Sequence, residues 1–164
     1  MAGVQTRQNR QLTAPAVFLR INFMKTSDNG RAFIRAREGV KLAAYQDGGG
    51  VWTIGYGHTR GVKQGQVINH EQADDFLAGD LRQVDSCISE RVAVVLNQNQ
   101  FDALASFVFN VGRRAFSDST LLKKLNEGNY RAAADQFTRW VYDNNQFVQG
   151  LYNRRVAERD LFLS

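Results

Sequence analysis

Two carboxylates and a hydroxyl follow one another closely in the first third of the chain. Asp47 comes nine positions after Glu38, and Thr53 comes six positions after Asp47. Hydrolysis of a glycosidic bond requires two carboxyl groups in different environments, one protonated to donate to the leaving oxygen and one ionised. The residue types and their spacing suit that chemistry. Each residue taken alone would be read as structural, because Asp before Gly is a common turn residue and Thr is a common strand residue.

The sequence places the two carboxylates in contrasting surroundings. Glu38 falls in the last turn of a predicted helix, where the negative end of the helix dipole disfavours the charged form of a carboxyl group. Arg35 and Arg37 are close enough in sequence to oppose part of this effect. Asp47 lies in a Gly-rich turn, where water and backbone N–H groups favour the carboxylate. The two environments therefore differ in the direction that an acid and a base require.

The predicted secondary structure changes character near residue 69. Ser27 or Asp28 caps a short helix that Gly39 ends, and apolar runs at 42–45 and 51–56 flank a Gly-rich turn, which predicts a β-hairpin. After Asn69, helical periodicity is found in five stretches, near 73–88, 101–108, 121–125, 132–142 and 151–163. No strand is predicted after about residue 68. We therefore predict an α+β fold with a small N-terminal β-hairpin lobe, a larger C-terminal helical lobe and an active-site cleft between them.

A longer and more specific pattern surrounds the three candidate residues. The chain resembles the phage-type lysozymes of glycoside hydrolase family 24 in the block Glu38-Gly39, Leu42, Ala44-Tyr45, Asp47 and Trp52-Thr53-Ile54-Gly55-Tyr56-Gly57-His58-Thr59. The resemblance continues through Gln100-Phe101-Asp102-Ala103-Leu104, 106–112, Ser119-Thr120-Leu121-Leu122, and Arg154-Arg155 with Glu158. It covers about residues 27–163. It implies a mostly helical, lysozyme-like catalytic domain over 27–164, preceded by a basic arm over 1–26.

The resemblance also implies an activity and roles for individual residues. Members of this family are N-acetylmuramidases that hydrolyse the β-1,4 bond between N-acetylmuramic acid and N-acetylglucosamine in bacterial peptidoglycan. By similarity Glu38 is the general acid, and Asp47 and Thr53 position and activate water on the opposite side of the bond. Inversion is then expected, with carboxyl groups about 6.5–9.5 Å apart. No metal or cofactor is implied. The expected substrate-binding residues are Phe109, Ser119 and Gln136, the last standing where an Asn occurs in the family.

Basic residues are concentrated at the N-terminus. The chain has 21 Lys and Arg against 16 Asp and Glu, and residues 1–26 contain four of the basic residues and none of the acidic ones. Such an arm attracts polyanions, so it either binds the anionic bacterial envelope or is an inert leader. The rest of the chain is almost neutral and lacks the basic face that nucleic-acid binding requires, so no nucleic-acid partner is expected.

The arm carries no predicted export or membrane segment. Its most apolar stretch, 14–24, is interrupted by Pro15, Arg20 and Asn22 and is shorter than the roughly 20 apolar residues of a membrane span. For an endolysin this predicts accumulation in the host cytoplasm, release through a holin pore and lysis of the host cell. Cys87 is the single cysteine, so no internal disulfide is expected. We expect a monomer.

Two other functions stay open at this point. His58, His70 and Cys87 are possible zinc ligands, which makes a zinc amidase acting on peptidoglycan an alternative enzyme. Chelation would inactivate an amidase and not a muramidase. The basic arm would also suit a non-enzymatic protein that binds cell wall or nucleic acid, although such a protein has no reason to keep the three catalytic candidates together.

Overall fold

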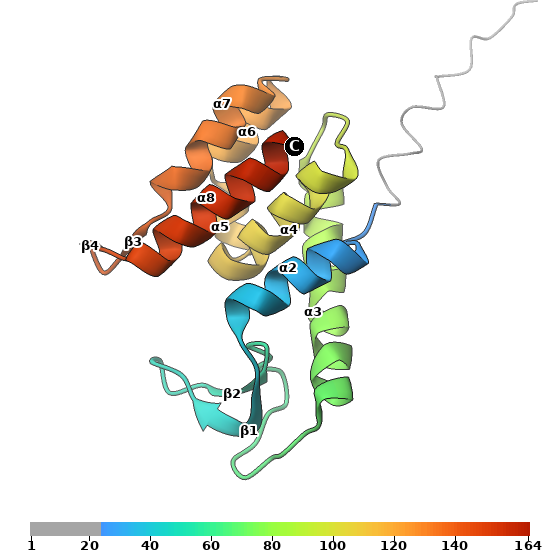
Figure 1. The fold of residues 1–164 in the computed structure, drawn as a ribbon, viewed down its shortest axis with the longest axis vertical. Coiled ribbons are helices and arrows are strands. Elements are labelled where there is room, and N and C mark those ends of the chain that lie inside the picture. Colours follow the sequence, from blue (N-terminus) through green and yellow to red (C-terminus); the bar gives the residue numbers. More distant parts are fainter. Residues whose placement is uncertain (1–23) are drawn as a thin grey trace, which may run out of the picture.

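The computed structural model describes residues 24–164, which form a small lobe with a two-stranded sheet and a larger lobe of helices (Figure 1). The predicted α+β class is confirmed. Helix α3 runs from the small lobe into the helical lobe. The elements in chain order are α2 (Asp28–Glu38), β1 (Lys41–Gln46), β2 (Trp52–Gly55), α3 (His70–Arg91), α4 (Gln98–Val111), α5 (Arg113–Ser117), α6 (Thr120–Asn126), α7 (Tyr130–Gln136), the 3-10 helix η2 (Phe137–Arg139), β3 (Tyr142–Asp143), β4 (Gln146–Phe147) and α8 (Gln149–Leu163).

Helix α2 carries Glu38 at its C-terminal end and is fixed at its N-terminal end. The Ser27 side chain caps the helix by accepting a hydrogen bond from the backbone N–H of Gly30. Ser27 also donates from its backbone N–H and its hydroxyl to Asp102, a buried carboxylate of α4. A Cβ at Gly30 would come within 2.6 Å of the Asp102 carboxylate, so this close approach requires glycine. Gly39 then ends the helix at φ 66°, a conformation that favours glycine.

The predicted hairpin after α2 is confirmed. Strands β1 and β2 pair antiparallel, with Lys41 opposite Gly55 and Tyr45 opposite Thr53, and the register shifts between these two pairs. Beneath the sheet a small core joins the strands to the start of α3. Its fully or nearly fully buried members are Ile54, Ile68 and Ala73.

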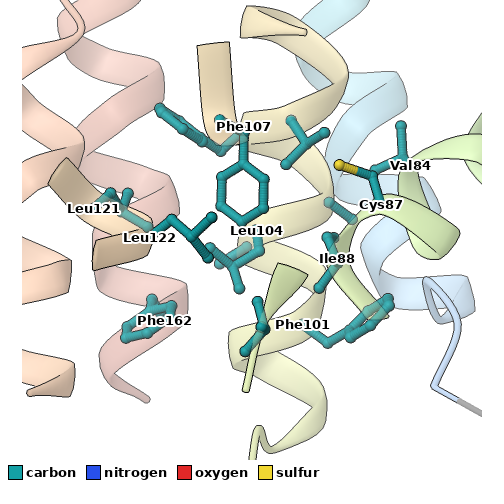
Figure 2. Packing of buried hydrophobic residues seen from close by; sticks show 14 of the residues in the cluster. Val84, Cys87, Ile88, Phe101, Leu104, Phe107, Leu121, Leu122 and Phe162 are labelled. Atoms are coloured by element: carbon teal, nitrogen blue, oxygen red, sulfur yellow. The ribbon is translucent and has the colours of Figure 1, made fainter. Parts of the chain in front are cut away.

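Helix α4 forms the centre of the helical lobe, because every residue from Phe101 to Val108 is buried. A helix that is apolar on most sides must be surrounded by other elements, and α2, α3, α5 and α8 all contact it. Figure 2 shows α4 side chains between those of α3 on one side and those of α6 and α8 on the other. The labelled core residues are Val84, Cys87, Ile88, Phe101, Leu104, Phe107, Leu121, Leu122 and Phe162.

Two sequence-based predictions about the later part of the chain are wrong. A second antiparallel hairpin, β3–β4, follows residue 68, with Tyr142 opposite Phe147. Asn144 and Asn145 form its turn at φ 46° and 61°, and Asn tolerates this left-handed conformation better than most residues. The helix predicted over 132–142 ends early, because β3 of this hairpin begins at Tyr142. Helix α7 stops at Gln136, and η2 continues only to Arg139. Strands of two residues are too short for their alternation to be seen in a sequence.

The residues just before α2 pack against the helical lobe. Thr26 donates to Asp85 of α3 from its backbone N–H at 3.1 Å and from its hydroxyl at 2.6 Å. The Lys25 carbonyl accepts a hydrogen bond from Gln98 at 3.0 Å, and Met24 packs against the core. The last three residues of the expected arm therefore belong to the packed lobe.

The rest of the arm, with Arg7, Arg10, Arg20 and the apolar residues of 16–23, lies outside the described residues. Within residues 24–164, no helix has both the length and the apolar character that crossing a membrane demands.

Asp85 gives a testable stability effect. Burial raises the pKa of the Asp85 carboxyl, and the two Thr26 hydrogen bonds oppose the shift only in part. The folded chain then holds this proton more tightly than the unfolded chain, so keeping Asp85 ionised costs stability once the pH exceeds the usual carboxyl range. Asp85→Asn keeps the oxygen that accepts from Thr26. We expect the variant to raise the free energy of unfolding at pH 7 by about 0.5 kcal/mol, after discounting for solvent screening, and by less at pH 4.

Urea unfolding at pH 4 and pH 7 measures this difference. Asp75 is exposed and lies on the same helix, so Asp75→Asn is a matched control that removes one solvent-exposed negative charge. A lower stability of Asp85→Asn at pH 7 would show that the carboxylate charge is needed there.

Candidate functional site

Glu38 lies between two hollows at the junction of the lobes. The first, of about 380 Å³, is bounded by the segment after β2 and by α3 and α4. Its lining includes Tyr56, Thr59 and Phe109 as well as Glu38. The second, of about 760 Å³, lies toward α8 and contains Glu38 together with residues at the start of that helix, including Leu151. The Glu38 carboxyl group is therefore placed at the predicted cleft.

Arg154 of α8 is the cation that contacts Glu38. Its Nη1 donates to Glu38 Oε1 at 2.6 Å, and the Glu38 side chain is 20% exposed. The two arginines that the sequence placed near Glu38 are engaged elsewhere. Arg35 donates to a carboxylate on α3, and Arg37 lies over the ring of Phe33. The positive charge beside Glu38 thus comes from Arg154, in the C-terminal helix, and not from its neighbours in sequence.

A buried network holds Arg154 in place. Glu158 is fully buried, and its Oε1 accepts from Arg154 Nε at 2.9 Å and from the Ser106 hydroxyl at 2.7 Å. Its Oε2 accepts from Arg155, which also donates to the side-chain oxygen of Asn110. Burial lowers the pKa of the Arg155 guanidinium, and the Glu158 charge opposes this shift. Each buried charge has hydrogen-bonded partners, as burial of charge requires.

Sequence reasoning missed this network, although α8 carried a signal of it. Leu151, Arg155, Glu158 and Phe162 recur at the spacing of one helix face. Charged residues at the core positions of an apolar stripe indicate a buried ion pair, because unpaired charges are rarely fully buried.

Asp47 and Thr53 lie on the β1–β2 hairpin. The exposed Asp47 accepts hydrogen bonds from the backbone N–H groups of Gly49 and Val51, both at 2.9 Å and both at Oδ1. Thr53 is 4% exposed, and its hydroxyl donates to the Val51 carbonyl at 3.0 Å. Neither residue lines either of the two hollows that contain Glu38.

The three expected substrate-binding residues are placed differently from one another. Phe109 lines the first hollow with Glu38. Ser119 is buried and caps α6, accepting from Leu122 and donating to the Phe116 carbonyl. Gln136 is half-buried at the end of α7. Ser119 and Gln136 line neither of the hollows that contain Glu38.

The three candidate zinc ligands do not form a site. His58 Nδ1 lies 2.8 Å from Asp80, and its Nε2 lies 2.9 Å from the Arg60 carbonyl. Cys87 is buried in α3, and burial raises the pKa of its thiol. Over residues 24–164, no three His, Cys, Asp or Glu side chains are grouped so that they could hold a metal ion. The amidase alternative therefore lacks a ligand set in this part of the chain.

Comparison with known proteins identifies the family of the chain. The phage lysozyme family matches residues 35–158. The endolysin of Acyrthosiphon pisum secondary endosymbiont phage 1 is 46% identical over 86% of this chain and 99% of its own length. The endolysin of Salmonella phage P22 is 44% identical over 86% of this chain and 99% of its own.

A solved structure gives the same result in three dimensions. The muramidase domain of SpmX from Asticcacaulis excentricus superposes with a TM-score of 0.82 at 39% identity, covering 85% of this chain and 98% of that domain. The family match includes Glu38, and the two endolysins and the solved domain each cover more than four fifths of the chain. The chain therefore belongs to the phage lysozyme family and is a glycoside hydrolase of the lysozyme type.

Proposed function

We propose that this lysozyme acts as a phage endolysin that hydrolyses the β-1,4 bond between N-acetylmuramic acid and N-acetylglucosamine in peptidoglycan. The observation that carries the proposal is the position of Glu38, a partly exposed carboxyl group at the junction of the lobes held by Arg154. Arg154 is in turn fixed by the buried Glu158. A general acid must be held within reach of the leaving oxygen, and this arrangement provides that support.

The proposed reaction uses one proton donor and one water molecule. Glu38 transfers its proton to the glycosidic oxygen as the bond from that oxygen to the anomeric carbon breaks. Water attacks the anomeric carbon from the opposite face, and Asp47 accepts the proton that the water loses. Thr53 donates its hydrogen to Val51, so its oxygen lone pairs are left to accept a hydrogen bond from the water. Proton exchange with solvent then restores both carboxyl groups for the next turnover.

The reaction products test this proposal. Purified peptidoglycan is digested with the enzyme, and the soluble fragments are analysed by mass spectrometry after borohydride reduction. A muramidase leaves N-acetylmuramic acid at the new reducing end. Reduced N-acetylglucosamine ends, or free peptide amines of the kind an amidase releases, would overturn the proposed bond specificity.

Asp47→Ala and Thr53→Ala are expected to lower turnover by about 10²–10⁴-fold each, because each removes a group that handles the attacking water. Neither substitution is expected to lower the free energy of unfolding by much more than about 1 kcal/mol, since each removes hydrogen bonds within one hairpin. Thr53→Ser keeps the hydroxyl and serves as the matched control. Initial rates on soluble wall fragments and thermal unfolding check both parts. An unfolded variant, or one with the wild-type rate, would favour a purely structural role for that residue.

Besides peptidoglycan, two expected partners would bring the enzyme to its substrate: a holin pore and the anionic bacterial envelope. We propose that the chain stays in the host cytoplasm as a monomer until a holin pore releases it to the wall, where it lyses the host. We also propose that the basic arm adds attraction to the anionic bacterial envelope.

Deletion of residues 1–23 tests the arm. It leaves Met24 and the Thr26 contacts with α3 in place, so cleavage of soluble wall fragments is expected to continue. Sedimentation with whole cells is expected to fall at low salt, where charges act over about 30 Å, and to differ less near physiological salt, where they act over roughly 8 Å. Identical sedimentation of the full-length and shortened chains across a salt series would identify the arm as an inert leader.

A further inference from the structure

A second groove opens from the catalytic hollow on the side of α3 and α5. Its volume is about 990 Å³. It shares Gln83, Gly112 and Arg113 with the hollow that contains Glu38 and Phe109, so the two hollows are adjacent. A substrate bound beside Glu38 therefore lies next to this groove.

Four exposed arginines line this second depression, which we call the arginine groove. They come from α3 and from the start of α5: Arg82, Arg91, Arg113 and Arg114. The lining acids are Glu90 and Asp118, so positive charge predominates.

Several arginines elsewhere on the surface are paired with a carboxylate, although within residues 24–164 Arg60 and Arg139 are exposed and outside any ion pair, like these four. Four others are each paired with a nearby carboxylate, as in Arg31–Asp28, Arg35–Asp74, Arg131–Asp135 and Arg159–Asp160. None of the groove arginines forms an ion pair within the described part of the chain, 24–164. Their guanidinium groups are therefore available to an anionic ligand.

We propose that the arginine groove binds the carboxylate groups of the peptide stems that peptidoglycan carries on its N-acetylmuramic acid units. The inference rests on the proposed muramidase function. A planar guanidinium pairs with a carboxylate through two parallel hydrogen bonds, which suits arginine for this ligand better than lysine. The position of the groove next to the hollow that contains Glu38 favours the stems of the bound strand itself over a separate phosphate polymer. With this groove, the enzyme is expected to cleave glycan that carries peptide stems in preference to bare glycan.

The test compares two soluble substrates prepared from the same glycan strands. One preparation keeps its peptide stems, and the other has lost them to treatment with a separate amidase. The variant Arg91→Gln with Arg114→Gln removes two groove charges. Lys123→Gln with Arg139→Gln removes two exposed charges, from α6 and η2, that likewise form no ion pair within residues 24–164, and is the matched control. The measured quantity is the ratio of kcat/KM on stem-bearing strands to kcat/KM on bare strands.

The wild-type enzyme is expected to favour stem-bearing strands, and the groove variant is expected to lower that ratio about three- to tenfold, the range for two solvent-exposed charge contacts. The control variant is expected to keep the wild-type ratio. Raising the salt to about 0.5 M is expected to reduce the wild-type preference, because it shortens the range of the charge interaction.

Three outcomes would overturn the proposal. They are an unchanged ratio in the groove variant, an equal fall of the ratio in the control variant, and inhibition of the wild type by inorganic polyphosphate with no preference for stems. The last outcome would assign the groove to phosphate polymers. Failure of the wild type to cleave either substrate would instead contradict the muramidase function itself, so the two failures are distinguishable.

Discussion

Glu38→Gln is expected to lower lytic activity by at least 10²–10⁴-fold while the chain stays folded. A glutamine keeps the shape of the side chain and an oxygen that accepts from Arg154, but it has no proton to donate to the leaving oxygen. Turbidity loss of a peptidoglycan suspension gives the rate, and near-ultraviolet circular dichroism with thermal unfolding checks the fold.

The stability of this variant is expected to be close to that of the wild type. Arg154 keeps its hydrogen bonds to Glu158 and to the Ser106 carbonyl when the Glu38 charge is removed. Glu71→Gln, at an exposed position in the first turn of α3, makes the same chemical change away from the site. Lysis by Glu38→Gln at the rate of Glu71→Gln would remove Glu38 from the role of acid.

Glu158→Ala is expected to give the largest loss of stability, about 3–5 kcal/mol of the free energy of unfolding. The substitution leaves Arg155, which is fully buried, without its charged partner, and it removes the acceptor that fixes Arg154. An uncompensated buried charge is far more costly than a lost surface pair. Glu127→Ala, which removes the exposed partner of Lys124, is expected to cost under about 1 kcal/mol.

Urea unfolding of the two alanine variants measures this contrast. A second variant separates charge burial from packing: Arg154→Met, Arg155→Met and Glu158→Leu together remove the whole buried charge set. Because no fully buried charge is then left unpaired, and Glu38, which loses Arg154, is partly exposed, this triple variant is expected to recover most of the stability that Glu158→Ala loses, while its activity stays low without Arg154. A stable Glu158→Ala protein would contradict the account of the network.

Local signals were sufficient to predict the elements that carry the catalytic candidates. The cap that begins α2, the glycine that ends it and the Gly-rich turn of the first hairpin are all short-range features, and the structure confirms them. The β3–β4 hairpin was missed because its strands have two residues each. Two residues on each side of the turn at Asn144 and Asn145 are too few to show the alternation of polar and apolar residues that identifies a strand.

The partners of Glu38 were beyond such local reasoning. Glu38 and Arg154 are 116 positions apart, and only the packing of α8 against α4 and α2 brings them together. The nearby Arg35 and Arg37 were the natural expectation from sequence, yet helix geometry directs them to α3 and to Phe33. Contacts between distant segments depend on the tertiary fold, which a single sequence does not specify residue by residue.

The stereochemistry of the product tests the central claim most directly, namely that Glu38 donates the proton while Asp47 and Thr53 direct water to the opposite face. Proton NMR follows the anomeric signals of the new reducing end during the first minutes of hydrolysis, before mutarotation equilibrates them. The account predicts that the α anomer forms first, by inversion of the β-1,4 bond. Initial appearance of the β anomer would indicate retention and would contradict the roles given to Asp47 and Thr53.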